Sequence, residues 1–270
     1  MPAIVKEWRF AGVIIRTLVK DSIHYPTRLV SETFILASRC GLLLLLYWYV
    51  FNLRGGTVGG TTFPYVAWSM YLYFALSSLR IRGLSEMVMA DVQSGNVEVL
   101  MNKPISYLSY RAWWQIGSGA YPFLVVAILG TIALVLTVGI PVTMTLHLFL
   151  PTFILTFLGA VILSTILYMI VGLMAFWVED ISPLYWILDK TIMILGGSYL
   201  PIALFPALMY KIAIYSPFGA SQFVSHAVLP TWQTDWYNLV GIQIIWIVLL
   251  GALMLWIFNK AKQKISVNGG

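Results

Sequence analysis

Charged residues are scarce in this 270-residue chain, and cysteine is almost absent. Only 10% of the residues are charged and 60% are hydrophobic, whereas about a quarter of the residues of a soluble domain are charged. This balance excludes a soluble globular domain and indicates an integral membrane protein. The single cysteine, Cys40, lies in an apolar run, so a disulfide within the chain is excluded.

Several signatures of enzymes are also missing. The sequence has no Gly-x-x-x-x-Gly-Lys-Ser/Thr loop, no His-Glu-x-x-His, no cysteine pair and no paired carboxylates. Ser118 and Ser198 lie in glycine-rich settings that an intramembrane protease would need, but small residues in spans usually allow close helix packing. We therefore expect no catalytic residue, no metal and no cofactor in this chain, and no nucleic-acid partner.

Long apolar runs separated by short polar breaks predict transmembrane helices, because a span needs about 20 mostly apolar residues. The expected fold is all-α, a polytopic integral membrane protein with one six-helix transmembrane domain over residues 27–258. The six predicted spans are Arg28–Leu53, Thr62–Ile81, Ala112–Val138, Leu146–Val178, Ser182–Leu200 and Leu239–Phe258.

Glycine and proline interrupt the apolar sequence at two places. Val138–Thr143, with the sequence VGIPVT, separates the third and fourth spans, whose combined charge-free stretch is too long for one helix. Residues 201–235 are apolar but contain four prolines. This segment is predicted to form short re-entrant or interfacial helices on the outer side of the membrane.

Lysine and arginine are unevenly distributed between the predicted loops, and the richer side of a membrane protein faces the cytoplasm. One side carries only Arg54 and Lys211. The other side carries Lys6, Arg9, Arg16, Lys20, Arg28, Arg80, Arg82, Lys103, Arg111, Lys260, Lys262 and Lys264. The prediction is a multi-pass protein of the plasma (inner) membrane with both termini, including a tail over residues 259–270, in the cytoplasm.

The N-terminal residues have a helical periodicity with one basic side. On a helix over residues 4–23, four basic residues fall on one stripe and the apolar residues, Trp8 among them, fall opposite. The basic residues are Lys6, Arg9, Arg16 and Lys20. Residues 1–26 are predicted to form an amphipathic helix in the inner membrane interface, in contact with lipid. The alternative is a solvated helix on a soluble domain, for which the composition leaves no room.

Ionisable residues inside the predicted spans are candidates for function, because a charge is costly in the bilayer. Arg39 lies in the first span, just inside its cytoplasmic boundary, with Glu32 seven residues earlier on the same face as a candidate partner. Asp189 and Lys190 lie midway along the fifth span and point to different faces because they are adjacent. Each of the two either meets a partner on a neighbouring helix, reaches the inner interface or contacts a substrate.

A short polar segment at about residues 91–104 lies between the second and third spans. Gly95 is a natural stop for the preceding helix, and Pro104 ends the segment. The sequence NVEVLM between them predicts a helix of one or two turns, with Asn96 as its cap.

The periodicity of this short helix predicts an apolar face. Val97, Leu100 and Met101 share one side, and Glu98 lies on another. We expect an exposed docking helix whose apolar face enters a groove of a cytoplasmic partner, which would contribute about 1.5–3 kcal/mol for each fully buried side chain. The alternative is a surface turn that packs back on its own helices.

Two stretches resemble a known family. SGNVEVLMNKPISYLSY (Ser94–Tyr110) resembles the cytoplasmic loop of a subgroup of ABC type-2 exporter permeases. LGGSYLPIALFP (Leu195–Pro206), followed by YSPFG (Tyr215–Gly219), is similar to that family's segment between the fifth and sixth spans. The N-terminal amphipathic helix and the order of six spans also match, so the resemblance covers nearly the whole chain.

The resemblance implies partners and a role for the polar segment. It implies a second permease chain, identical or related, and two ATP-binding cassette ATPase subunits that bind ATP and Mg²⁺. It also implies that the loop between spans two and three is the coupling helix that sits in the ATPase groove. The residues concerned are Gly95, Asn96, Val97, Glu98, Leu100 and Met101.

The sequence thus predicts the permease subunit of an ABC exporter of a small molecule, drug, peptide or lipid-like substrate. Export is favoured because the importer loop signature with Glu-Ala-Ala and a distal Gly is missing. The alternative is a secondary carrier or channel that needs no ATPase. A third reading is an intramembrane enzyme that uses Ser198.

Overall fold

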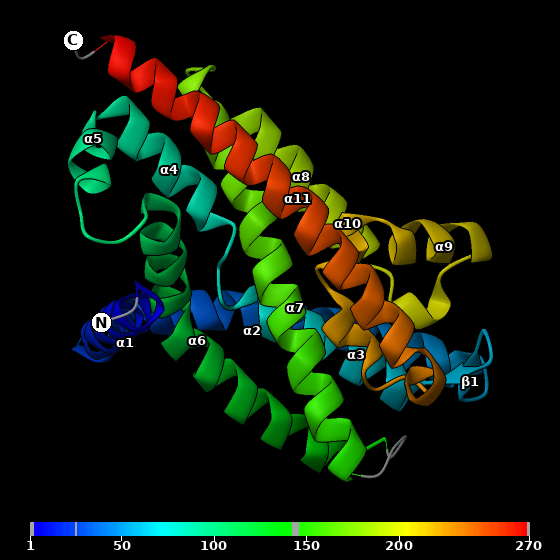
Figure 1. Cartoon of the computed structure of the whole chain (residues 1–270). Helices are drawn as coiled ribbons and strands as arrows, with labels where there is room; N and C mark the ends of the chain where they lie inside the picture. The colour runs from blue at the N-terminus through cyan, green and yellow to red at the C-terminus, as the bar shows by residue number, and fades with distance from the viewer. Residues whose placement is uncertain (1–2, 25, 142–145, 269–270) are drawn as a thin grey trace.

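The structure, a computed structural model, describes residues 3–24, 26–141 and 146–268, and these fold into a bundle of helices (Figure 1). The only strands in the described part are β1 (Thr57–Val58) and β2 (Thr61–Thr62), which form a small antiparallel pair. The longer helices are α1 (Ala3–His24), α2 (Pro26–Leu53), α3 (Phe63–Ser77), α4 (Gly83–Gln93), α6 (Tyr107–Thr137), α7 (Leu146–Leu173), α8 (Ser182–Leu195) and α11 (Trp232–Asn268). The predicted all-α class is confirmed.

Four helices of the described part are long and apolar enough to cross a membrane, namely α2, α6, α7 and α11. The predicted second and fifth spans are shorter than expected. The second ends as α3 at Ser77 and the fifth ends as α8 at Leu195. At 1.5 Å per residue such helices are only about 22 Å long, whereas the hydrocarbon core is about 30 Å thick. Four of the six predicted spans therefore correspond to helices long enough to cross a membrane, and the count of six stays a prediction.

The second span is interrupted because the chain turns between α3 and α4. Arg80 has a left-handed backbone with φ of 55°, the only residue other than glycine with a positive φ in the described ranges. A turn inside a bundle exposes backbone groups that need partners. Gln115 of α6, itself buried, supplies one by donating from its Nε2 to the carbonyl of Arg80 at 2.8 Å.

The centre of the bundle is formed by α7, which lies beside α11 over much of its length (Figure 1). Buried apolar side chains of α7, including Leu163 and Leu173, belong to the largest hydrophobic cluster together with Trp232 at the start of α11. Gln243 of α11 donates from its Nε2 to the carbonyls of Thr156 and Ala220, at 3.3 and 2.9 Å. The two helices are thus joined by apolar contact and by a buried amide.

Both predicted interruptions of the apolar sequence are confirmed. α6 ends at Thr137 and α7 begins at Leu146. Residues 142–145, which include the last two residues of the predicted break, lie outside the described part. Residues 201–235 form short helices, namely η2 (Ile202–Leu204), α9 (Ala207–Tyr215), α10 (Pro217–Ala220) and η3 (Phe223–His226). Residues 219–229 are buried, and η3 packs on α3 and α7. The second half of this segment therefore returns into the bundle.

The last helix extends further than predicted at both ends. α11 begins at Trp232 and continues to Asn268, so most of the expected tail over residues 259–270 continues this helix. Ala261 is fully buried, and Lys264 donates from its Nζ to the carbonyl of Phe176 at 2.7 Å. The extension is helical because this part of the chain has neighbours to pack against.

The N-terminal residues form the predicted helix, α1, but its apolar face contacts protein. A Cβ on Gly117 of α6 would lie 3.0 Å from a methyl group of Leu18 and 3.2 Å from Cα of Ile15. Arg9, Arg16 and Lys20 are exposed, while the side chains of Lys6 and Trp8 lie outside the described part. The expectation that the whole apolar face contacts lipid is therefore corrected in part, and the placement of α1 in the membrane interface stays a prediction.

Glycines of α6 allow the close packing that the sequence predicted for the Gly117–Ala120 stretch. A Cβ on Gly119 would overlap the carbonyl group of Leu79, next to the turn after α3. Backbone atoms cannot rotate away as a flexible side chain can, so α6 and the turn would have to separate.

The variant Gly119→Ala is expected to lower the stability of the protein by about 1–3 kcal/mol, because it overpacks a close contact. The measurement is the apparent melting temperature of the purified protein in a neutral detergent. Gly41→Ala in α2 is the matched control, since nothing lies within 4 Å of its new methyl group. Equal melting temperatures for the two variants would contradict this account of the contact.

Candidate functional site

The short helix α5 (Asn96–Met101) forms at the residues that the sequence predicted. It lies beyond the end of α4, at the same end of the molecule as the C-terminus (Figure 1). Gly95 precedes it with a left-handed backbone, φ 73°, a conformation that glycine adopts without strain. Gly95 therefore takes the cap position expected of Asn96, and no side chain caps this end of the helix.

The apolar face of α5 is turned toward its own chain. Val97 is 4% exposed and Leu100 is 9% exposed, and both belong to the main hydrophobic cluster, against which Met101 also packs. The expectation that these three side chains face a partner is therefore wrong. A helix of six residues held between α4 and α6 can bury its apolar side against those two helices. Burial against its own chain requires the same apolar periodicity as burial against a partner.

A different set of side chains is presented on the outer side of α5. Val99 is 67% exposed, which is unusual for an apolar side chain on a helix that packs so closely on its own chain. The other exposed residues along this segment are Gln93, Ser94, Gly95, Asn96, Glu98, Asn102, Lys103 and Pro104. The exposed face is thus polar at its edges, with one apolar side chain among the polar ones.

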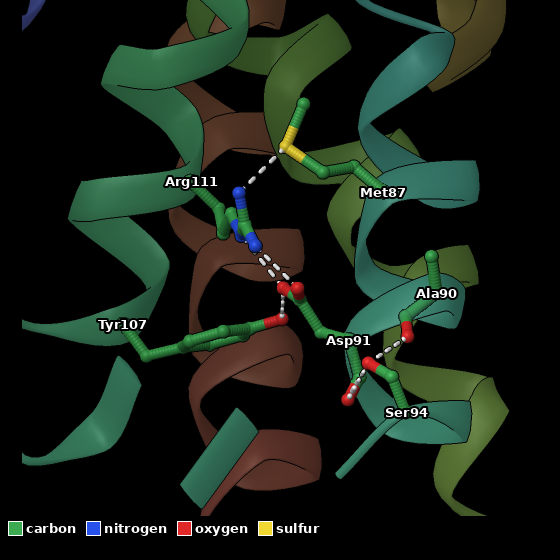
Figure 2. Close-up of polar contacts among 6 residues, drawn as sticks. All are labelled: Met87, Ala90, Asp91, Ser94, Tyr107 and Arg111. Atoms are coloured by element: carbon green, nitrogen blue, oxygen red, sulfur yellow. Dashed lines mark hydrogen bonds and ion pairs between the residues drawn. The ribbon is translucent and has the colours of Figure 1, made fainter. Parts of the chain in front are cut away.

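The two helices that hold α5 are joined by a buried ion pair (Figure 2). Arg111 of α6 contacts both carboxylate oxygens of Asp91 on α4: its Nε lies 2.6 Å from Oδ2 and its Nη2 contacts Oδ1. The Tyr107 hydroxyl donates to Asp91 Oδ2 at 2.8 Å. The side chains of Asp91 and Arg111 are only 6% and 13% exposed. A bidentate ion pair of this kind fixes the relative orientation of the two side chains and also stabilises their contact.

Further contacts extend this cluster to the neighbouring elements. The ring of Tyr107 stacks on that of Phe258 in α11, with centroids 6.0 Å apart and planes 14° apart. Arg111 also lies near Met87 of α4, with Nη1 3.2 Å from Sδ. Side-chain contacts therefore hold the helices α4, α6 and α11 together directly beside α5.

Sequence reasoning did not identify this pair. Asp91 is the first residue of the polar segment and Arg111 follows it, so the only signal is an acid and a base that flank a short helix. The two residues are 20 positions apart. They meet because the chain reverses through α5, which places α6 beside α4.

The loop between α7 and α8 lies next to the same end. Gln93 at the end of α4 donates from its Nε2 to the carbonyl of Glu179 at 2.7 Å. Asp180 accepts the backbone N–H of Ser182 at 2.8 Å, and this hydrogen bond lowers the pKa of its carboxyl group. The surface around α5 therefore combines carboxylates with the exposed lysines Lys260 and Lys262 of α11.

The structure separates the two adjacent charges of the predicted fifth span. Asp189 is buried and meets neighbouring elements, accepting from the hydroxyl of Tyr168 at 3.1 Å and lying 3.7 Å from Nη1 of Arg82. Lys190 is exposed, with its Nζ 5.2 Å from the ring centre of Trp186. The reading in which such a charge meets a partner on a neighbouring element is confirmed for Asp189.

Arg39 of α2 meets residues that follow α8. Its guanidinium lies 5.1 Å from the ring centre of Tyr199 and 5.6 Å from that of Phe74 on α3. Its Nη2 lies 3.5 Å from the hydroxyl oxygen of Ser198, which is fully buried. The side chain of Glu32, its candidate partner, lies outside the described part.

Four long apolar helices are typical of an integral membrane protein. A sequence profile of the family described as "ABC-2 family transporter protein" matches residues 40–269, which is most of the chain. The chain therefore belongs to this family and is a membrane permease component of an ABC transporter, which works with ATP-binding subunits. No curated protein matches the chain.

Proposed function

We propose that this permease is an exporter subunit and that α5 is its coupling helix, which receives the movement of an ATPase. The observation that carries this proposal is the way α5 is held. Its outer face is exposed, and its inner face and the Asp91–Arg111 pair join it to α4 and α6. A force applied to α5 would therefore move two helices of the bundle together.

In this proposal the chain crosses the membrane six times, with both termini in the cytoplasm of a cell whose inner membrane holds the transporter. The second crossing consists of α3 and α4, which are joined through the turn at Arg80. The fifth consists of α8 and the glycine-containing turn after it. The basic residues of α1 and α11, and Lys103 after α5, then lie on the cytoplasmic side, where lysine and arginine are enriched in membrane proteins.

In this proposal the chain forms the transport pathway and transmits movement through α5, and it catalyses no reaction. ATP and Mg²⁺ would be bound by two ATPase subunits, and a second permease chain, identical or related, would complete the pathway. Closing of the ATPases on ATP would move α5 and shift the spans between inward and outward access. The missing importer loop signature supports export.

The alternative function is a carrier or channel that needs no ATPase. The two are distinguished by purifying the tagged full-length chain from its native membrane and identifying its companions by mass spectrometry. We expect an ATP-binding cassette subunit in stable complex with the chain and ATP hydrolysis by that complex. A chain that transports while it is free of any such subunit would exclude the exporter.

The proposed topology predicts which positions an impermeant thiol reagent reaches in intact cells. In a Cys40→Ser background, single cysteines replace Thr57 at β1, Asn96 at α5 and Lys262 at α11, all of which are exposed. Labelling is expected at position 57 alone, and at all three positions after the cells are permeabilised. Labelling of position 96 in intact cells would reject both the topology and the coupling role.

A further inference from the structure

A cavity of about 250 Å³ lies between α3, α6, α7 and the segment around η3, and we call it the aromatic cavity. Six of the thirteen residues that line it are aromatic, whereas aromatic residues make up only 15% of the whole chain. These six are Trp68, Tyr71, Phe123, Phe149, Phe153 and Phe157. Aromatic side chains are thus concentrated around this one space.

The polar groups of its wall already have partners within the chain. Trp68 donates from its Nε1 to the carbonyl of Gly139 at 2.7 Å. The Tyr71 hydroxyl donates to the carbonyl of Ala127 at 2.7 Å and lies 2.9 Å from Oγ1 of Thr131. In the part of the chain that the structure describes, no charged side chain lines the cavity. A charged ligand would lose its hydration there without replacement, so the wall favours an apolar ligand.

Three phenylalanines of α7 give the cavity a wall of nearly parallel rings. Phe149, Phe153 and Phe157 are spaced four residues apart, which places them on one side of the helix. Successive ring centres are 5.5 and 6.4 Å apart, and the ring planes differ by only 22° and 20°. Phe123 of α6 lies beside Phe157, with ring centres 5.2 Å apart. Because aromatic rings attract one another in offset-stacked and edge-to-face arrangements, this wall favours a ligand that is itself aromatic.

The volume of the aromatic cavity indicates the size of such a ligand. Protein interiors contain few voids larger than a water molecule, and an apolar cavity of about 150 Å³ takes up benzene in preference to water. The aromatic cavity is larger than that, so it has room for one ring or for two fused rings. A bound ring system would supply the contacts that the lining side chains lack on the side of the cavity.

The proposed topology places the aromatic cavity in the outer half of the membrane domain. Its α6 residues lie in the second half of that helix, and its α7 residues lie in the first half of the next. In that topology the chain passes outside the membrane between these two helices. The cavity is therefore on the side at which an exporter releases its substrate.

We propose that the aromatic cavity binds the ring system of the exported substrate, an uncharged group of one or two fused aromatic rings. The inference rests on the proposed function and narrows its substrate to lipophilic aromatic small molecules. A lipid acyl chain could fill the same volume, but it would make no use of the stacked rings of α7.

The test uses a photoreactive iodonaphthyl azide on the full-length chain, purified in a neutral detergent with the subunits that accompany it. Labelling of peptides that contain residues 123–131 or 149–157 is expected to saturate with probe concentration and to be abolished by excess naphthalene. Excess dodecane, which resembles an acyl chain, should leave this labelling unchanged. Non-saturable labelling of these peptides, or competition by dodecane as strong as that by naphthalene, would overturn the proposal.

Two variants of the cavity wall and two matched controls keep the test decisive. Ala127→Phe places a ring inside the cavity and should abolish the saturable labelling. Phe153→Leu keeps the wall apolar but removes one ring, and it should weaken binding about two- to tenfold, the value of an aromatic pair. Ala252→Phe on α11 and Phe34→Leu on α2 make the same exchanges at exposed positions and should leave binding unchanged. Equal binding by wild type and Phe153→Leu would contradict the role of the rings.

ATP hydrolysis by the complex links the aromatic cavity to transport. Naphthalene should stimulate hydrolysis in the wild type, and Ala127→Phe should lose this response. Binding that leaves hydrolysis unchanged would overturn the assignment of the cavity to the substrate. The companion-subunit experiment tests the exporter function separately: a chain that binds naphthalene but carries no ATPase would reject the exporter and keep the site.

Discussion

Replacing Asp91 with alanine is expected to destabilise the protein by about 3–5 kcal/mol and to abolish transport, because the change leaves Arg111 buried without a counter-ion. The Tyr107 hydroxyl would lose its acceptor at the same time. With the pair gone, α4 and α6 are no longer held at a fixed distance beside α5, so movement of α5 is no longer passed to both. The measurements are the apparent melting temperature and transport by the reconstituted complex.

The double variant Asp91→Leu with Arg111→Met separates charge from packing. Replacing both members of a buried pair by apolar side chains is often neutral or stabilising, so the melting temperature should return to near that of the wild type. Glu179→Ala removes an exposed carboxylate on the same surface and should leave the melting temperature unchanged. An Asp91→Ala protein that melts like the wild type would show that the pair does not hold the helices together.

Replacing Val99 with aspartate is expected to dissociate the ATPase without unfolding the permease. Val99 is the large apolar side chain on the exposed face of α5, and an unpaired charge buried in a partner's groove is heavily penalised. We expect at least about a tenfold loss of copurified ATPase, equivalent to about 1.4 kcal/mol. The melting temperature of the permease should not change, because Val99 is not part of its core.

Two comparisons make this result interpretable. Leu208→Asp on α9 places the same charge at a position that is 72% exposed and lies far from α5 (Figure 1), so ATPase association should survive it. Leu100→Asp should instead lower the melting temperature, because Leu100 is buried in the permease itself. If Val99→Asp still copurifies with its ATPase in full amount, α5 is a turn of the structure and another surface binds the ATPase.

The α5 segment shows where prediction from the sequence succeeded and where it stopped. The bounds Asn96–Met101 follow from Gly95 before the helix and the proline after it, which are local constraints on the backbone. The set of residues on its apolar face also follows from the helical repeat. Whether that face meets a partner or the chain itself does not, since the repeat is the same in both cases.

The charged residues of the helices show the same division between what the sequence predicts and what only the structure shows. That Arg39 and Asp189 lie in apolar runs is visible in the sequence, and so is the cost of leaving them unpaired. Which groups pair with them is set by the packing of α2, α3, α7 and α8, and this packing brings Arg82 and Tyr168 to Asp189. The Asp91–Arg111 pair forms across a reversal of the chain that no spacing rule anticipates.

The sequence by itself determined that this protein lies in the membrane, that it is helical, where its helices break at Val138–Thr143, and that residues 201–235 form short helices. These properties depend on hydropathy and on glycine and proline, which act over a few residues. Only the tertiary structure decided that the second span is divided at Arg80, that α11 continues to Asn268, and which face of α5 is free. Each of these depends on which neighbour buries a side chain or accepts a backbone hydrogen bond, and neighbours distant in the sequence are chosen by the packing of the whole bundle.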